Sequence, residues 1–127
     1  MSVRRRRAEA RGRWAERLAM VWLVLKGYRL LDHRARTAAG EIDLVARKGE
    51  YLVFVEVKAR GDAETARASI GTRQRRRIER AAMLWKARNR AFSSLFPRYD
   101  LILVVPGRWP VHERAAWVPP DASLDYL

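Results

Sequence analysis

The sequence contains no cysteine and no apolar run long enough to span a membrane. Without cysteine there are no disulfides and no thiolate metal sites, which fits a reducing compartment. The basic N-terminus leads into a charged, amphipathic segment instead of the apolar core of a secretory signal. We therefore expect a cytoplasmic protein without a membrane segment.

Acidic residues are also scarce, since 14 Asp and Glu stand against 27 Lys and Arg, for a net charge of +13. This imbalance predicts a polyanionic partner, nucleic acid first. A hydrophobic content of 49% over 127 residues predicts one globular domain. Poor order is expected only for the basic tail at residues 1–8 and for residues 119–127, which begin with two prolines.

Two segments rich in β-branched and aromatic residues meet at Gly49-Glu50 and predict a β-hairpin over residues 40–58. Glycine at the first loop position suits a type II′ turn. In the register that this turn sets, Asp43 faces Glu56 and Glu41 faces Lys58. The hairpin thus places two carboxylates opposite each other.

Directly opposed side chains have Cβ atoms about 4.5–5.5 Å apart, so Asp43 and Glu56 repel unless one is protonated or a cation lies between them. Two interpretations stay open: a solvated ladder of cross-strand ion pairs, or a divalent-metal site in a cleft. Val45 and Phe54 share this face of the hairpin, and apolar neighbours favour the metal site.

Apolar periodicity predicts the other elements. We expect a helix over residues 8–26, a strand over 28–36, a loop over 60–68, a second helix from Ser69 or Thr72 to about Arg90, a buried strand over 98–105 and a short strand over 111–118. The buried stripe of the first helix is predicted to be Trp14, Leu18, Val21, Trp22 and Leu25. Helices around a sheet of mixed strand direction predict an α/β fold.

Three further polar features stand near the hairpin. Glu16 lies off the predicted stripe of the first helix, and Gln74 lies on the apolar face of the second. His33 is expected to be a surface or structural residue.

The first turns of the second helix carry a basic cluster, namely Arg73, Arg75, Arg76, Arg77 and Arg80. The cluster is either a solvated face or, because cations are unfavourable at a helix N-terminus, a phosphate-binding site.

The segments Gly40-Glu41-Ile42-Asp43-Leu44 and Val53-Phe54-Val55-Glu56-Val57-Lys58-Ala59-Arg60 resemble the PD-(D/E)xK nuclease superfamily. More narrowly, they resemble the bacterial YraN-like family, which is similar to Holliday-junction resolvases. The resemblance extends over about residues 9–117, with matches at Gly12, Glu16, Ala19, Gly27-Tyr28, Gly71, Gln74 and Arg98-Tyr99-Asp100. One departure is Ile42, which stands where the motif has proline. The resemblance implies a restriction-endonuclease-like core.

The resemblance also implies a Mg²⁺-dependent endonuclease that acts on DNA rather than RNA, including branched or repair intermediates. Asp43, Glu56 and the Val57 carbonyl would bind Mg²⁺, or Mn²⁺ in its place. Lys58 would position the water or stabilise the transition state. Glu16 and Gln74 would complete the site, and the basic cluster with Arg60 would hold the phosphate backbone.

The alternative function is a nucleic-acid-binding protein with a nuclease fold and little or no catalysis. The charge alone supports binding, whereas the intact set of Asp43, Glu56 and Lys58 favours the nuclease. An RNA- or ribosome-associated basic domain would leave the carboxylate pair unexplained. The resolvase likeness also allows a homodimer.

Overall fold

The structure is a computed structural model that describes residues 3–120, apart from the side chains of residues 4–11. The elements in chain order are α1 (Val3–Leu25), β1 (Arg29–Thr37), β2 (Gly40–Lys48), β3 (Tyr51–Ala59), α2 (Ala63–Ala68), α3 (Thr72–Arg88), the 3₁₀ turn η1 (Arg90–Phe92), β4 (Phe96–Val104) and β5 (Val111–Trp117). The predicted α/β fold is confirmed. No helix within residues 3–120 is long and apolar enough to cross a bilayer.

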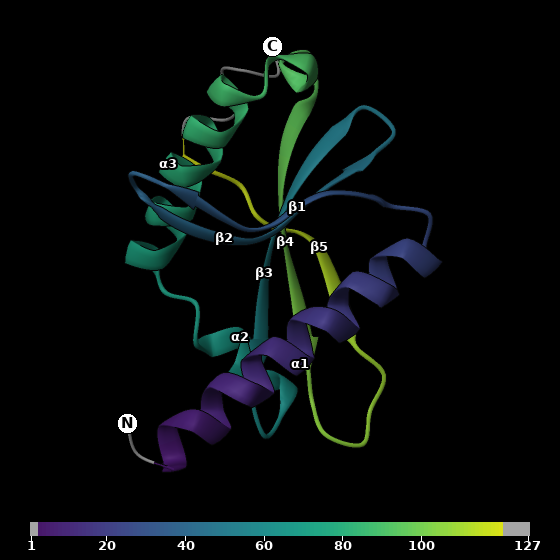
Figure 1. The fold of residues 1–127 in the computed structure, drawn as a ribbon, viewed down its shortest axis with the longest axis vertical. Coiled ribbons are helices and arrows are strands. Elements are labelled where there is room, and N and C mark those ends of the chain that lie inside the picture. Colours follow the sequence, from purple (N-terminus) through teal and green to yellow (C-terminus); the bar gives the residue numbers. More distant parts are fainter. Residues whose placement is uncertain (1–2, 121–127) are drawn as a thin grey trace.

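The five strands form one sheet in sequential order, β1-β2-β3-β4-β5. Only β3 and β4 are parallel, because α2 and α3 carry the chain back across the sheet between them, whereas the other pairs are antiparallel. Helices α1 and α3 flank the sheet (Figure 1). β3 and β4, the central pair, are therefore buried, and their carboxyl ends lie at the same edge of the sheet.

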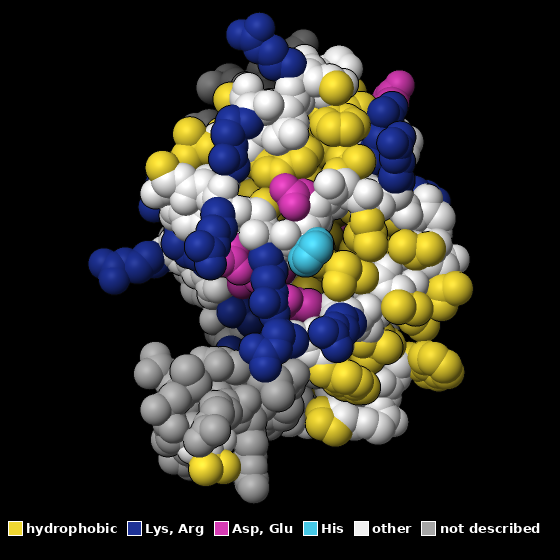
Figure 2. Space-filling view, in the orientation of Figure 1, with side chains coloured by type: hydrophobic (Ala, Val, Ile, Leu, Met, Phe, Trp, Pro, Cys, Tyr) yellow, Lys and Arg dark blue, Asp and Glu magenta, His cyan; other side chains and the backbone are white. Residues whose placement is uncertain are grey.

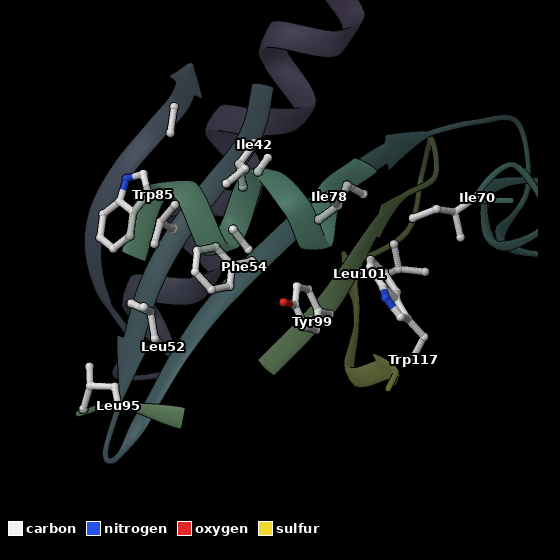
Figure 3. Close-up of a cluster of buried hydrophobic side chains, with 14 of the residues drawn as sticks. Ile42, Leu52, Phe54, Ile70, Ile78, Trp85, Leu95, Tyr99, Leu101 and Trp117 are labelled. Atoms are coloured by element: carbon white, nitrogen blue, oxygen red, sulfur yellow. The ribbon is translucent and has the colours of Figure 1, made fainter. Parts of the chain in front are cut away.

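The larger core lies between α3 and the sheet. Trp85 of α3 meets Phe54 edge-on at a ring distance of 6.1 Å, and Phe54 stacks on Tyr99 at 5.8 Å (Figure 3). Tyr99 in turn stacks on Trp117 of β5 at 5.4 Å. This run of rings crosses the sheet from α3 to its β5 edge and holds α3 in a fixed position over β3.

The face that α1 buries differs from the predicted one. Its buried residues are Ala15, Ala19 and Leu23, whereas Trp14 is 60% exposed and Leu25 is 74% exposed. The prediction followed the large apolar side chains and was wrong, because the small alanines let the helix lie close against the sheet. The correction matters for Glu16, which borders the true buried face.

The helix boundaries in the structure differ from the predicted ones in three other places. α1 begins at Val3, inside the segment that was predicted to be a tail, and residues 121–127 of the predicted C-terminal tail lie outside the described residues. The predicted loop contains the short helix α2, whose N-cap Asp62 accepts a hydrogen bond from the Thr65 amide at 2.7 Å. The N-cap of α3 is Gly71, and no side chain caps it.

The predicted turn and register of the hairpin are confirmed along most of its length. Gly49 has φ +59° and no positive φ occurs at Glu50, as a type II′ turn requires. β2 and β3 then pair from Lys48–Tyr51 to Leu44–Val55. The ladder stops there, before the carboxylates are reached.

A buried polar network that the sequence did not predict joins β4 and β5. Asp100 has no exposed surface and accepts hydrogen bonds from Arg98, from the Ala115 amide at 3.0 Å and from His112 Nε2 at 2.7 Å. Burial alone would raise the pKa of Asp100, but the hydrogen bonds from His112 and Arg98 hold it below its ordinary value. The network fastens β5 to the sheet at a bulge where Ala115 has φ +48°.

Candidate functional site

The site forms where β2 and β3 separate. If the ladder continued beyond Leu44–Val55, the Val57 amide would face Ile42. Instead, Asp43 Oδ2 accepts the hydrogen bond from the Val57 amide at 2.8 Å. The predicted direct pairs, Asp43 with Glu56 and Glu41 with Lys58, are therefore wrong: the Asp43 side chain takes the place of a backbone partner.

A break in the strand pattern turns Asp43 into this position. Leu44 packs in the core under α1, while both Val45 and Ile42 pack in the core under α3, so the alternation of faces slips by one residue at Asp43. Opposite Asp43, between the pairs His33–Leu44 and Ala35–Ile42, lies Arg34. Arg34 has φ +47°, a left-handed conformation that costs a non-glycine residue about 1–2 kcal/mol.

Glu56 points from β3 into the same opening and is 6% exposed. Its Oε1 accepts a hydrogen bond from Gln74 Nε2 at 3.0 Å and lies 3.6 Å from Lys58 Nζ. Its Oε2 is buried and has no hydrogen-bond partner within the described part of the chain. A buried carboxylate oxygen without a partner is costly, which makes it a fitting ligand for a cation.

The electrostatics of the two carboxyls follow from burial. Burial raises the pKa of Asp43 to about 6, while the Val57 hydrogen bond opposes the shift. Burial and the nearby charge of Asp43 raise the pKa of Glu56 to about 8, and Lys58 and Arg77 offset only part of this. Both carboxyls therefore keep their protons to higher pH than free carboxyls do, and a cation bound between them would favour their ionised forms.

Glu16 extends from α1 toward the site, but its carboxylate is bound by Arg34. Its Oε2 accepts a hydrogen bond from Arg34 Nε at 2.8 Å, and it shares a surface pocket with Arg34, His33 and Arg13. Among the side chains that the structure describes, those of Val3 and residues 12–120, no group of three or more His, Cys, Asp and Glu is spaced to hold a metal. The residues best placed to bind a metal ion are accordingly Asp43 and Glu56, and Glu16 lies near them.

The predicted basic residues do not act as one cluster. Arg76 pairs with Glu79, and Arg75 lies 5.7 Å from the Trp117 ring. Arg73 and Arg80 are exposed, and Arg60 is exposed at the end of β3.

Arg77 alone lies at the carboxylates, where it donates to the Glu41 carbonyl at 3.3 Å. It passes close to Gly40, where an added Cβ would lie 2.5 Å from the guanidinium. The φ of +135° at Gly40 is what favours glycine as the first residue of β2.

Figure 2 shows Asp and Glu side chains near the centre of one face of the molecule, bordered by Lys and Arg side chains. Of the predicted residues, the structure brings together Asp43, Glu56, Lys58, Gln74 and the backbone of Val57. Arg34 was missed, because no sequence pattern marks a non-glycine residue that adopts a left-handed conformation.

Comparison with known proteins gives a family. Residues 15–104 match the model of the uncharacterised protein family UPF0102. The chain belongs to this family. It is 69% identical to the UPF0102 protein of Maricaulis maris over the full length of both chains. It is 48% identical to a UPF0102 protein of Mesorhizobium japonicum, with 91% of this chain and 93% of the relative aligned.

The raised pKa values predict how stability depends on pH without metal. Since folded Glu56 and Asp43 hold their protons to higher pH than the unfolded chain does, their contribution to stability is full below about pH 4 and is lost as pH rises to about 8. The free energy of unfolding, measured by urea denaturation in EDTA, should fall by roughly 2–4 kcal/mol between pH 5 and pH 8.

The Glu56→Gln variant isolates this effect. It keeps an amide of the same shape beside Gln74 but has no proton to lose, so its stability should decline less over the same interval. An equal or steeper decline in the variant would show that Glu56 is not the titrating group.

Proposed function

We propose that this UPF0102 protein is a divalent-metal-dependent endonuclease that hydrolyses phosphodiester bonds in DNA. The observation that carries the proposal is the convergence of Asp43, Glu56 and Lys58 where β2 and β3 part, with one Glu56 oxygen buried and unpartnered. The resemblance of these segments to PD-(D/E)xK nucleases, similar to Holliday-junction resolvases, supports the same function. Branched and repair intermediates are the favoured substrates within it.

The fitting residues divide into holding and positioning groups. Asp43 and Glu56 would hold Mg²⁺, or Mn²⁺, with the Val57 carbonyl as a further oxygen donor. When bound, the ion supplies charge neutralisation at the phosphate and lowers the pKa of a water molecule. The Val57 amide fixes the orientation of Asp43, and Gln74 fixes that of Glu56.

Lys58 is the cation nearest the reacting phosphate in this proposal. Its side chain is 13% exposed and lies 3.6 Å from Glu56. A partly desolvated ammonium group is a stronger electrostatic partner than an exposed one, so Lys58 would orient the attacking water and stabilise charge on the phosphate oxygens. Arg77 adds positive charge on the α3 side of the same opening.

A second candidate function is nucleic-acid binding without robust catalysis. Two observations favour it: Glu16 is engaged by Arg34, and the described residues offer no three-ligand metal cluster. Under this alternative Asp43 and Glu56 would have only a structural role, and the basic surface would bind the nucleic acid.

Cleavage assays separate the two. Labelled linear, flap and four-way DNA substrates, with RNA counterparts, are incubated with Mg²⁺, Mn²⁺ or EDTA. We expect metal-dependent cleavage of DNA that falls by about 100-fold or more in Asp43→Asn and Glu56→Gln, since both variants keep the hydrogen-bonding shape but lose the charge. Asp62→Asn, a change at the exposed cap of α2, is the matched control and should cleave like the wild type. Equal cleavage by all four proteins would refute the catalytic assignment.

The basic surface makes a separate prediction about binding. The slope of log K against log salt counts the phosphates that are neutralised, at about 0.9 each for duplex DNA. Replacing exposed Arg73 and Arg80 together by alanine should lower the magnitude of this slope by about 2. Arg67→Ala is the control, because Arg67 is paired with Glu113 on the protein. If the affinity of the wild type does not change with salt concentration, these arginines do not contact the phosphates.

A further inference from the structure

Trp14 is an unusual residue to leave in solvent. It is the first tryptophan of α1, and 60% of its surface is exposed. An exposed indole forgoes the burial that stabilises most tryptophans. A single exposed apolar side chain is common on protein surfaces, so its meaning depends on the residues around it.

The indole forms one wall of a pocket at the end of the sheet. The other lining residues are Ala59, Arg60, Gly61, Val104 and Pro106. The Arg60 amide donates to the Val104 carbonyl at 3.3 Å, so the ends of β3 and β4 stay joined and form a firm floor. A Cβ added to Gly61 would meet no atom within 4 Å, so the mouth of the pocket is open.

The pocket lies at the same end of the sheet as the candidate catalytic residues. Lys58 and Ala59 are consecutive residues at the end of β3, where both pair with the end of β4. Because successive side chains of a strand point to opposite faces, Ala59 belongs to the face that α1 covers, whereas Glu56 and Lys58 lie on the other face. A nucleic-acid strand with its phosphate at Lys58 would therefore reach Trp14 by passing around the end of β3.

The charges around the pocket match that occupant. Arg60 lines it, and Arg13 and Arg17 of α1 are exposed on the neighbouring turns. Aromatic platforms combined with basic side chains are how proteins bind unpaired strands, because bases stack on the ring while cations contact the phosphates. By contrast, Trp109 already stacks on Trp22, with ring centroids at 5.6 Å.

We propose that the pocket of Trp14 and Arg60 binds an unpaired base of the DNA substrate, at the same end of the sheet as Asp43 and Glu56. This inference rests on the proposed nuclease function and narrows its substrate class to DNA with an unpaired nucleotide near the cut, such as a flap or a frayed junction. A second copy of the chain is a poorer occupant, because six lining residues are far fewer than a stable interface uses.

The test measures binding in EDTA, where no cleavage is needed. The probe is a duplex with a short single-stranded arm that carries 2-aminopurine at the unpaired position. Stacking on an indole should quench its fluorescence when the wild-type protein binds. Trp14→Ala should lose the quenching and bind the arm-bearing DNA roughly 10-fold more weakly, while its affinity for a blunt duplex stays within twofold.

Two variants serve as controls. Trp14→Phe keeps an aromatic face and should recover most of the affinity, and Trp109→Ala removes an exposed tryptophan elsewhere and should behave like the wild type. Equal weakening on arm-bearing and blunt DNA, or no weakening at all, would overturn the inference. A shift of the wild type from dimer to monomer in Trp14→Ala, measured by sedimentation, would also overturn it in favour of a second copy.

The outcomes separate this inference from the nuclease proposal. If the wild type fails to cleave any substrate but Trp14 still discriminates unpaired DNA, the catalytic proposal fails and the pocket remains. If the wild type cleaves and Trp14→Ala binds all DNA normally, the pocket assignment fails and the catalytic proposal remains.

Discussion

The hydrogen bond from the Val57 amide to Asp43 shapes the candidate functional site of this protein. It satisfies a backbone donor that the β2–β3 ladder would otherwise have used, so the two strands can separate without leaving that amide unpaired. Because β2 and β3 separate, Glu56, Lys58 and Gln74 meet in the opening. One side chain thereby ends the ladder and also supplies half of the candidate cation site.

The surroundings hold this opening in place at some cost. Arg34 adopts a left-handed backbone opposite Asp43, and Glu56 is buried with an unpartnered oxygen. Such strain and unmet polarity persist only where the rest of the fold compensates for them. The compensation comes from the ring stack between α3 and the sheet and from the Asp100 network in the middle of β4. In addition, Arg34 forms an ion pair with Glu16. The same strained residue therefore neutralises the carboxylate of Glu16, the third acidic side chain near the opening.

The sequence predicted features that depend on local periodicity and turn chemistry. The hairpin, its Gly49 turn, the order of the elements and the placement of Asp43, Glu56 and Lys58 on one face follow from residue spacing. The place of Gln74 beside them was implied by the family resemblance. The sequence could not predict the departure at Asp43, because the slip in alternation needs the φ of Arg34, which local sequence does not encode. The prediction of the buried face of α1 was wrong, because large side chains such as Trp14 outweigh alanines in a hydrophobic pattern. The Asp100 network joins residues far apart in the chain, and only the tertiary structure brings them together.

The central claim is that Asp43 and Glu56 form one divalent-cation site. Calorimetric titration of the protein with Mn²⁺ at pH 8 tests it most directly, with Glu56→Gln as the comparison. We predict saturable binding by the wild type, accompanied by proton release because Glu56, with a pKa of about 8, still holds part of its proton at this pH. Binding should be at least about tenfold weaker in the variant. Equal binding by the two proteins, or none by either, would contradict the claim.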